Sequence, residues 1–259
     1  MVRSLYSNEQ FTLVRCRQCS LIYVNPRQAE TAKYDQLLHG GAVSTYEKGQ
    51  ERDRQSFQSI LENLEQIAPP GHLLDVGCAT GGLLRAARER GWKTTGVEIN
   101  RDTAAFATRE HHLDVHHGTL DELQLPENSF DAVTLINVIE HLYRPSSTLR
   151  EVYRVLHPGG RLVCLTPDFN HYAIRLAQTV GFLRDADRID PTGHPYHFTP
   201  RTLARLINNQ GFQIAHCRSP ISGHNILANR SFLWPFIAAS RLISIGSTIQ
   251  CLAIKPLKA

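Results

Sequence analysis

The chain has 259 residues, of which 42% are hydrophobic and 20% are charged. This composition is ordinary for a globular protein and excludes a disordered chain, while the length suits one large domain or a domain with a small addition. The 28 Lys and Arg residues outnumber the 24 Asp and Glu residues by four, which is too weak a balance to indicate a nucleic-acid partner.

Cysteine usage and hydropathy exclude two further classes of protein. Six cysteines in a chain of this length do not make a disulfide framework. No apolar run approaches the roughly 18 residues that a membrane span needs, and residues 1–10 show no secretory leader. We therefore expect a soluble protein in the cytoplasm.

Residues 1–69 are expected to form a small β hairpin followed by a helical cap. Two short β-prone runs, 11–14 and 21–24, flank a Cys-x-x-Cys sequence. Polar segments of helical character follow at 29–38 and 53–67, and in the second of these the apolar side chains recur at helical spacing. Two prolines and a glycine then end the N-terminal region.

Residues 70–259 change to an alternation of strands and helices, which favours an α/β fold with a parallel, helix-covered sheet. The predicted strands lie at 73–76, 94–97, 113–116, 130–138, 161–166, 212–217 and 248–254. The predicted helices lie at 81–91, 101–109, 145–156, 170–180, 200–209 and 232–243. A Pro-Gly-Gly sequence at 158–160 is expected to form the turn into the fifth strand.

The most informative cluster is a glycine loop between the first of these strands and the helix after it. Gly77 and Gly81 have the spacing G-x-x-x-G, which differs from the G-x-G-x-x-G of a dinucleotide site, and Asp75 precedes them. An acid before the loop repels phosphates and suits the cationic end of a ligand. Glu98 ends the next strand, where a carboxylate can accept hydrogen bonds from both ribose hydroxyls. The alternative is a tight turn followed by a surface acid.

These stretches resemble the class I S-adenosylmethionine-dependent methyltransferases. The matching segments are LLDVGCATGGLL, TTGVEIN, GTLDELQLPENSFDAVTLINVIEHL and LREVYRVLHPGGRLVCLTPDF, which together cover residues 73–169. The resemblance implies a Rossmann-like, doubly wound sheet of seven mostly parallel strands with an antiparallel C-terminal strand, preceded by a small N-terminal β/α extension. Residues 70–259 would then be the methyltransferase domain.

The resemblance also implies the residues around the S-adenosylmethionine cofactor. Four would surround the methionine moiety, Glu98 would hold the ribose, Ile99 would pack on the adenine, Thr119 and Leu120 would face the adenine edge, and Asn137 and Val138 would close the site from the fourth strand. The four around the methionine moiety are Asp75, Gly77, Cys78 and Gly81. Two positions depart from the common pattern: Ala79 replaces the middle glycine, and Thr119 offers a hydroxyl where many members carry an Asp.

Three histidines are the candidates for the chemistry. Methyl transfer from a sulfonium is an in-line displacement, so the protein mainly aligns the reactants, although an oxygen acceptor also needs a base. His141 follows the fourth strand and is the first candidate for the base or for positioning the substrate, with capping of the next turn as the alternative. His194 and His197 precede the helix at 200–209 and are the second, with a surface loop as the alternative. Asp168 is a further pocket carboxylate.

Two features of the sequence are not explained by the resemblance to methyltransferases. Cys16 and Cys19 have the spacing of half a zinc knuckle, but no second pair precedes them, so we assign no metal site. The other four cysteines are expected to be small buried residues. The apolar segment 232–243 is too short to cross a bilayer; it is expected to cover the sheet, with contact to a membrane surface as the alternative.

The sequence therefore predicts an enzyme that transfers a methyl group from S-adenosylmethionine to a small-molecule acceptor, with an oxygen acceptor favoured by the histidines. N- or C-methylation of a metabolite, sugar or lipid is the first alternative, and a cofactor-binding protein without turnover is the second. A nicotinamide-dependent oxidoreductase is disfavoured by the loop spacing and by Asp75. The acceptor and the oligomeric state are not readable from the sequence.

Overall fold

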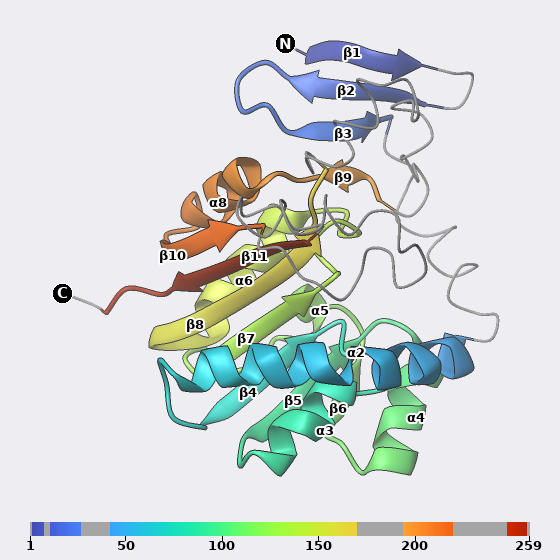
Figure 1. Cartoon of the computed structure of the whole chain (residues 1–259), viewed down its shortest axis with the longest axis vertical. Coiled ribbons are helices and arrows are strands. Elements are labelled where there is room, and N and C mark those ends of the chain that lie inside the picture. Colours follow the sequence, from blue (N-terminus) through green and yellow to red (C-terminus); the bar gives the residue numbers. More distant parts are fainter. Residues whose placement is uncertain (1, 8–10, 27–41, 170–193, 220–247, 258–259) are drawn as a thin grey trace, which may run out of the picture.

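The computed structural model describes residues 2–7, 11–26, 42–169, 194–219 and 248–257. They form two sheets, a large one flanked by helices and a small one at the N-terminal end of the molecule (Figure 1). The predicted helices at 29–38, 170–180 and 232–243, with the apolar segment considered for membrane contact, lie outside the described residues.

The large sheet has seven strands in the order β10-β11-β8-β7-β4-β5-β6. Its strands are β4 (His72–Val76), β5 (Lys93–Glu98), β6 (Val115–His117), β7 (Phe130–Ile136), β8 (Leu156–Pro167), β10 (Gln213–Arg218) and β11 (Thr248–Ile254). Pairing from β8 through β7 and β4 to β5 and β6 is parallel, whereas β11 runs antiparallel to both of its neighbours. This confirms the seven-stranded, doubly wound α/β fold.

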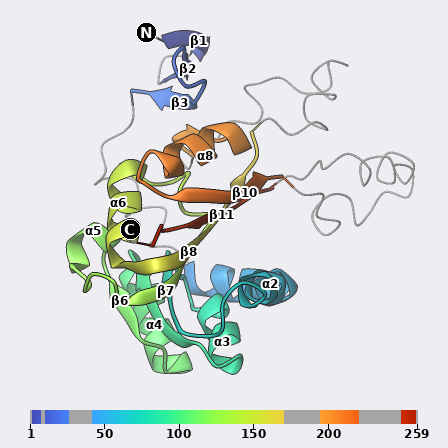
Figure 2. The same ribbon diagram turned by 90° about the vertical axis from the view of Figure 1, so that its left-hand side faces the viewer.

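Helices cover both faces of the large sheet. They are α2 (Ala42–Glu65), α3 (Gly82–Glu89), α4 (Arg101–His111), α5 (Leu120–Leu123), α6 (Pro145–Val155) and α8 (Pro200–Asn208). Figure 2 shows α2 and α3 on the side of the sheet opposite α5 and α6. Neighbouring strand residues point to opposite faces, so Leu74 packs in the core with α6 while Leu73 packs in the core with α2 and α3. A strand covered on both faces reads as a continuous apolar run, which is why β4 and β7 are conspicuous in the sequence.

The small sheet joins the N-terminus to a distant part of the chain. Its strands are β1 (Val2–Ser7), β2 (Thr12–Cys16), β3 (Ile22–Asn25) and β9 (Tyr196–His197), and each neighbouring pair is antiparallel. In the register, Ile22 faces His197 and Tyr23 faces Tyr196. The backbone N–H of Val24 also donates to the carbonyl of Pro195 at 3.0 Å. The expected hairpin is thus part of a four-stranded sheet, and the expected loop before residue 198 contributes one of its strands.

Several element boundaries differ from the predicted ones. Helix α2 begins at Ala42, well before residue 53, and the short helix α5 has no counterpart among the predicted elements. The fifth strand begins at Leu156, because the Pro-Gly-Gly segment continues the strand instead of turning into it. Its extension is held by two backbone hydrogen bonds, from Gly159 to the Lys255 carbonyl at 2.8 Å and from Lys255 to the Gly160 carbonyl at 2.9 Å.

The burial of the cysteines agrees with the sequence prediction at three positions and differs at one. Cys78, Cys164 and Cys251 are buried as expected, but Cys217 is only half-buried because β10 is the edge strand of its sheet. Helix α2 shares a core cluster with α3 and β4, so this part of the N-terminal region is packed against the large sheet. A domain boundary at residue 69 stays a prediction.

Candidate cofactor and acceptor site

The glycine loop begins where β4 ends and is fixed by the neighbouring strand. The backbone N–H groups of Gly77 and Cys78 both donate to the Val97 carbonyl, at 2.7 and 3.1 Å. Gly77 has φ +74°, and a Cβ at this position would lie 2.4 Å from Cγ2 of Val138. Only glycine fits this combination of a left-handed backbone and close approach. The loop therefore crosses the carboxyl edge of the sheet in a single defined path.

Gly81 and Cys78 serve the fold through their packing. Gly81 is the N-cap of α3 with φ +85°, and a Cβ there would lie 2.1 Å from Cδ1 of Leu113. The Cys78 side chain is 3% exposed and packs in the core cluster that includes Leu73 and Leu84. What these two residues present at the loop surface is their backbone, so any contact with a cofactor would be made by main-chain groups.

Glu98 ties the loop to the end of β5. One carboxylate oxygen, Oε2, accepts from the Ala79 N–H at 2.9 Å, and the other, Oε1, accepts from the Asn100 N–H at 2.8 Å. Burial raises the pKa of Glu98, and these backbone donors act in the opposite direction. Each oxygen keeps a further lone pair, so the carboxylate can still accept from two vicinal hydroxyls.

Asp75 places a second carboxyl beneath the loop. It is 4% exposed, and the Thr134 hydroxyl donates to its Oδ1 at 2.6 Å. Burial, with a smaller contribution from the negative charge of Glu98, raises the pKa of Asp75 to about 7. Two carboxyl groups at one edge of a sheet favour a ligand that carries positive charge at this point.

The predicted adenine contacts are divided between the surface and the core. Ile99 is 44% exposed, so an apolar side chain stands free at the edge directly after Glu98. The Thr119 hydroxyl donates to Oε2 of Glu122 at 2.8 Å, which leaves its lone pairs able to accept from an amino group. Leu120 is only 2% exposed and belongs to the core, so its backbone alone could face a ligand.

Asn137 and Val138 follow β7, whose Leu135 pairs with Val76 at the start of the loop. Asn137 is exposed with φ +54°, and its backbone N–H donates to the Leu165 carbonyl at 2.9 Å. Val138 lies directly over Gly77. The segment after β7 and the glycine loop therefore touch each other, as the prediction of one shared site requires.

The structure brings His141 and His194 together, although they are far apart in the sequence. Their ring centroids are 4.6 Å apart in an edge-on arrangement. Between β7 and His141 lies Glu140, which is 2% exposed and accepts from the Thr166 hydroxyl at 2.9 Å. Burial raises the pKa of Glu140, and the neighbouring His141 acts in the opposite direction.

His197 and Asp168 are more deeply buried than this pair. His197 is 7% exposed on β9, and its ring lies 4.8 Å from that of Phe169. Asp168 is also buried, and its Oδ2 accepts from the Ser219 hydroxyl at 2.6 Å. Because the ring of His197 packs on Phe169 while the rings of His141 and His194 remain half-exposed, His197 is the weaker candidate for direct chemistry.

Three residues near the site were missed by sequence reasoning. Thr134 and Thr166 hold Asp75 and Glu140, but a threonine inside an apolar strand gives no signal of what it bonds. Tyr46 lies on the part of α2 that was not predicted. Burial, and then the negative charge of Glu98, raises the pKa of Tyr46.

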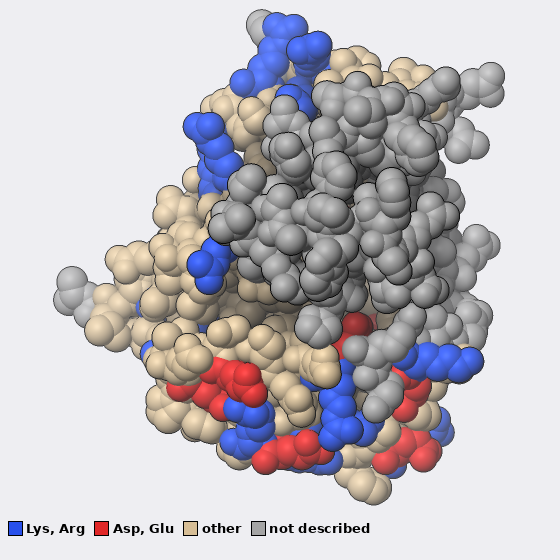
Figure 3. Space-filling model, in the orientation of Figure 1, with Lys and Arg blue, Asp and Glu red and all other residues tan. Residues whose placement is uncertain are grey.

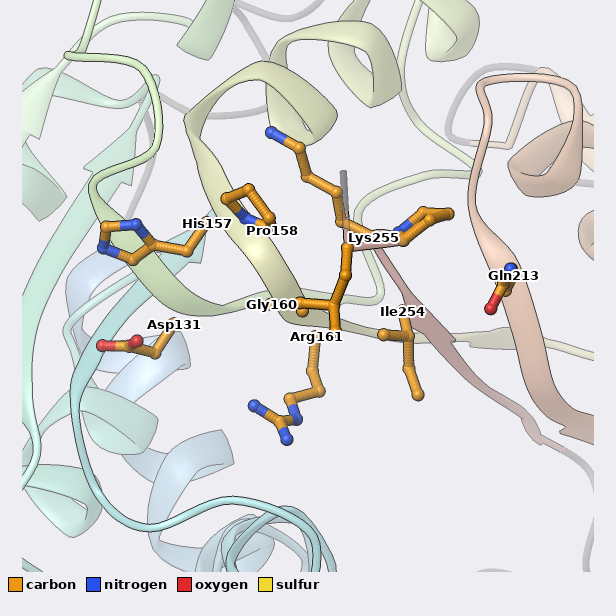
Figure 4. A pocket seen from close by; sticks show the side chains of 11 residues that line it. Asp131, His157, Pro158, Gly160, Arg161, Gln213, Ile254 and Lys255 are labelled. Atoms are coloured by element: carbon orange, nitrogen blue, oxygen red, sulfur yellow. The ribbon is translucent and has the colours of Figure 1, made fainter. Parts of the chain in front are cut away.

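A separate hollow of about 650 Å³ lies at the opposite edge of the sheet. It is lined by Asp131, the start of β8 from His157 to Arg161, and the end of β11 around Lys255 (Figure 4). Lys255 is 6% exposed, and its Nζ donates to Asn128 Oδ1 and the Leu156 carbonyl at 2.9 and 2.7 Å. None of the predicted site residues lines this hollow.

Charge is distributed differently over the two sheets. In Figure 3 acidic and basic side chains are interspersed over the lower part of the molecule, whereas basic side chains stand out at the top. Arg3, Arg15 and Arg17 are exposed there, and residues 2–7 and 11–26 contain no Asp or Glu. Among the described residues no helix is both long and apolar enough to cross a bilayer.

Comparison with known proteins agrees with this geometry. A family model described as a methyltransferase domain matches residues 49–217. The chain is 31% identical over 169 residues to a ubiquinone biosynthesis O-methyltransferase of Pseudomonas entomophila, which covers 59% of this chain and 68% of the relative. It is 36% identical over 107 residues to a demethylmenaquinone methyltransferase of Symbiobacterium thermophilum, which covers 38% and 43%.

Solved structures share the fold over a longer part of the chain. A SAM-dependent methyltransferase from Archaeoglobus fulgidus superposes with a TM-score of 0.57 at 20% identity and covers 78% of this chain and 94% of that one. The chain spans between 42% and 68% of the length of eight curated relatives that it matches. The family model matches more than half of this chain, so the chain belongs to the class I S-adenosylmethionine-dependent methyltransferases.

Proposed function

We propose that this protein transfers the methyl group of S-adenosylmethionine to a small-molecule acceptor, with an oxygen as the favoured acceptor atom. The observation that carries the proposal is the shared carboxyl edge of β4, β5 and β7. Glu98 and the glycine loop stand there beside the segment that leads to His141. The residues that we assign to the cofactor and a titratable side chain thus lie at one edge, as a two-substrate transfer requires.

The cofactor is proposed to lie across the loop between Asp75 and Glu98. The two oxygens of Glu98 would accept from the ribose hydroxyls, and Ile99 would pack on the adenine with Thr119 at its edge. The buried carboxyl of Asp75 would favour the cationic methionine end of S-adenosylmethionine. Gly77, Cys78 and Gly81 would contribute their backbone, and Asn137 and Val138 the opposite wall.

The transfer needs little from the protein beyond alignment and a place for one proton. An oxygen of the acceptor forms a bond to the methyl carbon while the carbon–sulfur bond breaks and its electron pair stays on sulfur. The sulfonium then becomes the neutral thioether of S-adenosylhomocysteine, and the hydroxyl proton of the acceptor must leave. We assign His141 and His194 to receive that proton or to position the acceptor, with His197 supporting from β9.

The names of similar proteins support one class of acceptor. They include a ubiquinone biosynthesis O-methyltransferase and a demethylmenaquinone methyltransferase, both named for quinones. An aromatic hydroxyl acceptor is therefore the class that we favour, with C- or N-methylation as the alternative.

We propose the cytoplasm as the location of this protein. The described cysteines are all free of disulfide bonds, which fits a reducing compartment.

Thermal denaturation with added cofactors tests this function at its first step. S-adenosylmethionine and S-adenosylhomocysteine should each raise the melting temperature, and NAD should not. Stabilisation by NAD alone would contradict the proposal. A second step is turnover of a panel of phenols with methyl-labelled cofactor. Binding without transfer to any acceptor would favour the non-catalytic alternative, and unchanged turnover in both His141→Ala and His197→Ala would remove these histidines from the chemistry.

A further inference from the structure

Glu140, His141 and His194 converge beside the cofactor edge with more donor atoms than a single proton transfer uses. One ligand atom from each residue lies within 4.8 Å of those of the other two. Oε1 of Glu140 and Nε2 of His141 are 4.0 Å apart, and the two imidazole rings are in contact. The ligand atoms of Glu140 and His141, which follow β7, thus lie close to that of His194, which precedes β9.

The carboxylate of Glu140 gives the second observation. The residue is only 2% exposed; its Oε2 accepts from Thr166, but its Oε1 receives no hydrogen bond from any of the described residues. A buried carboxylate oxygen without a donor is costly, by roughly 1–3 kcal/mol or more. A cation at the space between Oε1 and the two imidazoles would remove that cost.

The donor set selects the kind of cation. Two imidazole nitrogens and one carboxylate oxygen suit borderline divalent transition metals, Zn²⁺ foremost, more than Mg²⁺ or Ca²⁺, which prefer oxygen alone. Ligands about 2.0–2.2 Å from zinc stand about 3.4 Å apart in a tetrahedron, so the group must contract by about an ångström. His141 and His194 are half-exposed and can rotate, while Thr166 holds Glu140 in place as an outer-shell partner.

We infer that Glu140, His141 and His194 bind one divalent transition-metal ion of the Zn²⁺ class, whose open coordination position takes the oxygen of the methyl acceptor. This inference rests on the proposed function for the identity of that ligand, but not for the metal. With the ion bound, the two histidines would be ligands and not bases. The ion would lower the pKa of the bound acceptor hydroxyl, so that its proton passes to solvent water before the oxygen takes the methyl group.

The test uses the full chain, stripped of metal with a chelator and titrated with ZnCl₂ and CoCl₂. A Cys16→Ser, Cys19→Ser background removes the thiol pair, which could bind the same ions at the turn between β2 and β3. We expect one ion per chain in this background, and a Co²⁺ spectrum without sulfur-to-metal charge-transfer bands. Glu140→Gln and His194→Ala should each weaken the affinity by at least about 100-fold, whereas His157→Ala, at the opposite edge of the sheet, should not change it.

The outcomes separate this inference from the proposed function. Loss of metal affinity in the variants together with unchanged binding of S-adenosylmethionine supports the metal site, whether or not an acceptor is found. If the chain without the thiol pair binds no ion, or binds it equally well after His194→Ala, the inference is wrong even if methyl transfer is observed. Should Glu140→Gln fail to fold, the double variant His141→Ala, His194→Ala decides the question, because both side chains are half-exposed.

Discussion

At the carboxyl edge of the large sheet, the proposed cofactor side and the proposed acceptor side are built in different ways. Asp75, Gly77 and Glu98 all lie in one strand–helix–strand unit, β4-α3-β5, so the chain returns to the same edge after a short excursion. The acceptor side collects Glu140 and His141 after β7, Thr166 at the end of β8, and His194 before β9. One side is local in sequence and the other is assembled by the fold.

This difference indicates where each side is vulnerable. On the cofactor side the backbone is constrained, because the loop is held by Val97 from one strand and by Glu98 from its end. On the acceptor side the contacts of the candidate side chains come from separate segments, and β9 is tied to the segment after β7 by one backbone hydrogen bond, from the Tyr196 N–H to the Glu140 carbonyl at 3.4 Å. We therefore expect substitutions in the first region to abolish cofactor binding, and substitutions in the second to change acceptor use.

Gly77→Val should have the largest effect. The new side chain meets Val138 in a position where φ is +74°, so the loop cannot keep its path, and affinity for S-adenosylmethionine should fall by more than about 100-fold. Gly91→Val is the matched control, because Gly91 has φ +89° and a Cβ added there would meet nothing within 4 Å. Equal affinities of the two variants in calorimetric titrations would show that the collision at the loop is irrelevant.

Glu98→Gln should come next, with an affinity about 10- to 100-fold weaker. Glutamine offers one oxygen where the carboxylate offers two, so either Ala79 or Asn100 loses its acceptor and the ribose loses a charged partner. Glu89→Gln, on the exposed end of α3, serves as the control for removing one acid. If both variants bind the cofactor like the wild type, Glu98 does not hold the ribose.

Asp75→Asn should remove a dependence of folding stability on pH. The carboxyl has its ordinary pKa near 4 in the unfolded chain and about 7 in the folded chain, so the folded state holds the extra proton between these values. Folding stability without cofactor should accordingly fall as pH rises from about 4 to about 7, and level off above. The variant should lose this fall, which denaturant titrations across the pH range would reveal.

The same group predicts how cofactor binding responds to pH. A cationic ligand favours the ionised carboxylate, so binding below pH 7 must release a proton, and affinity should rise with pH until about 7. Asp75→Asn should bind S-adenosylmethionine about tenfold less tightly at pH 8 and with little pH dependence. A wild-type affinity that falls between pH 6 and 8 would contradict the assignment of Asp75 to the cationic end.

Ile99→Ala should have a moderate effect, because an exposed side chain gains its contacts only when adenine packs on it. We expect affinity for the cofactor to fall about three- to tenfold with no loss of folding stability. Ile67, which is 41% exposed and follows α2, provides the matched Ile67→Ala control. Fluorescence titration with S-adenosylhomocysteine is sufficient to distinguish them.

His194→Ala should change cofactor affinity least, by less than about twofold, although it contacts His141. Its effect should appear in acceptor use, as a higher KM or a lower kcat at saturating S-adenosylmethionine. A variant that loses cofactor binding as Glu98→Gln does would show that the two sides of the edge are not separate.

The cofactor side could be predicted from the sequence because its signals lie close together. The apolar run of β4, the glycines after it and Glu98 each indicate a structural role, and the structure places all of them at one edge. Leu120 shows the limit, since a position beside Thr119 was inferred to face adenine but its side chain lies in the core. A resemblance gives the position along the chain, and the turn of α5 decides which side chain points outward.

The acceptor side could not be predicted to the same depth. The contact of His194 with His141 depends on a two-residue strand, β9, which is too short for any periodicity to indicate it. The partners of Glu140 come from β8 and from before β9, and no local pattern links these segments. Sequence reasoning therefore named the histidines as candidates but could not show which of them meet, nor that a buried acid stands beside them.

Hydrogen exchange tests most directly whether the cofactor lies on the loop between Asp75 and Glu98. Backbone amides of the intact chain are compared with and without saturating S-adenosylmethionine. We predict slower exchange in peptides that cover 76–81, 98–100 and 119–120, and no change at 157–161, which line the hollow at the opposite edge. Protection confined to 157–161 and 254–257 would contradict a cofactor site on this loop.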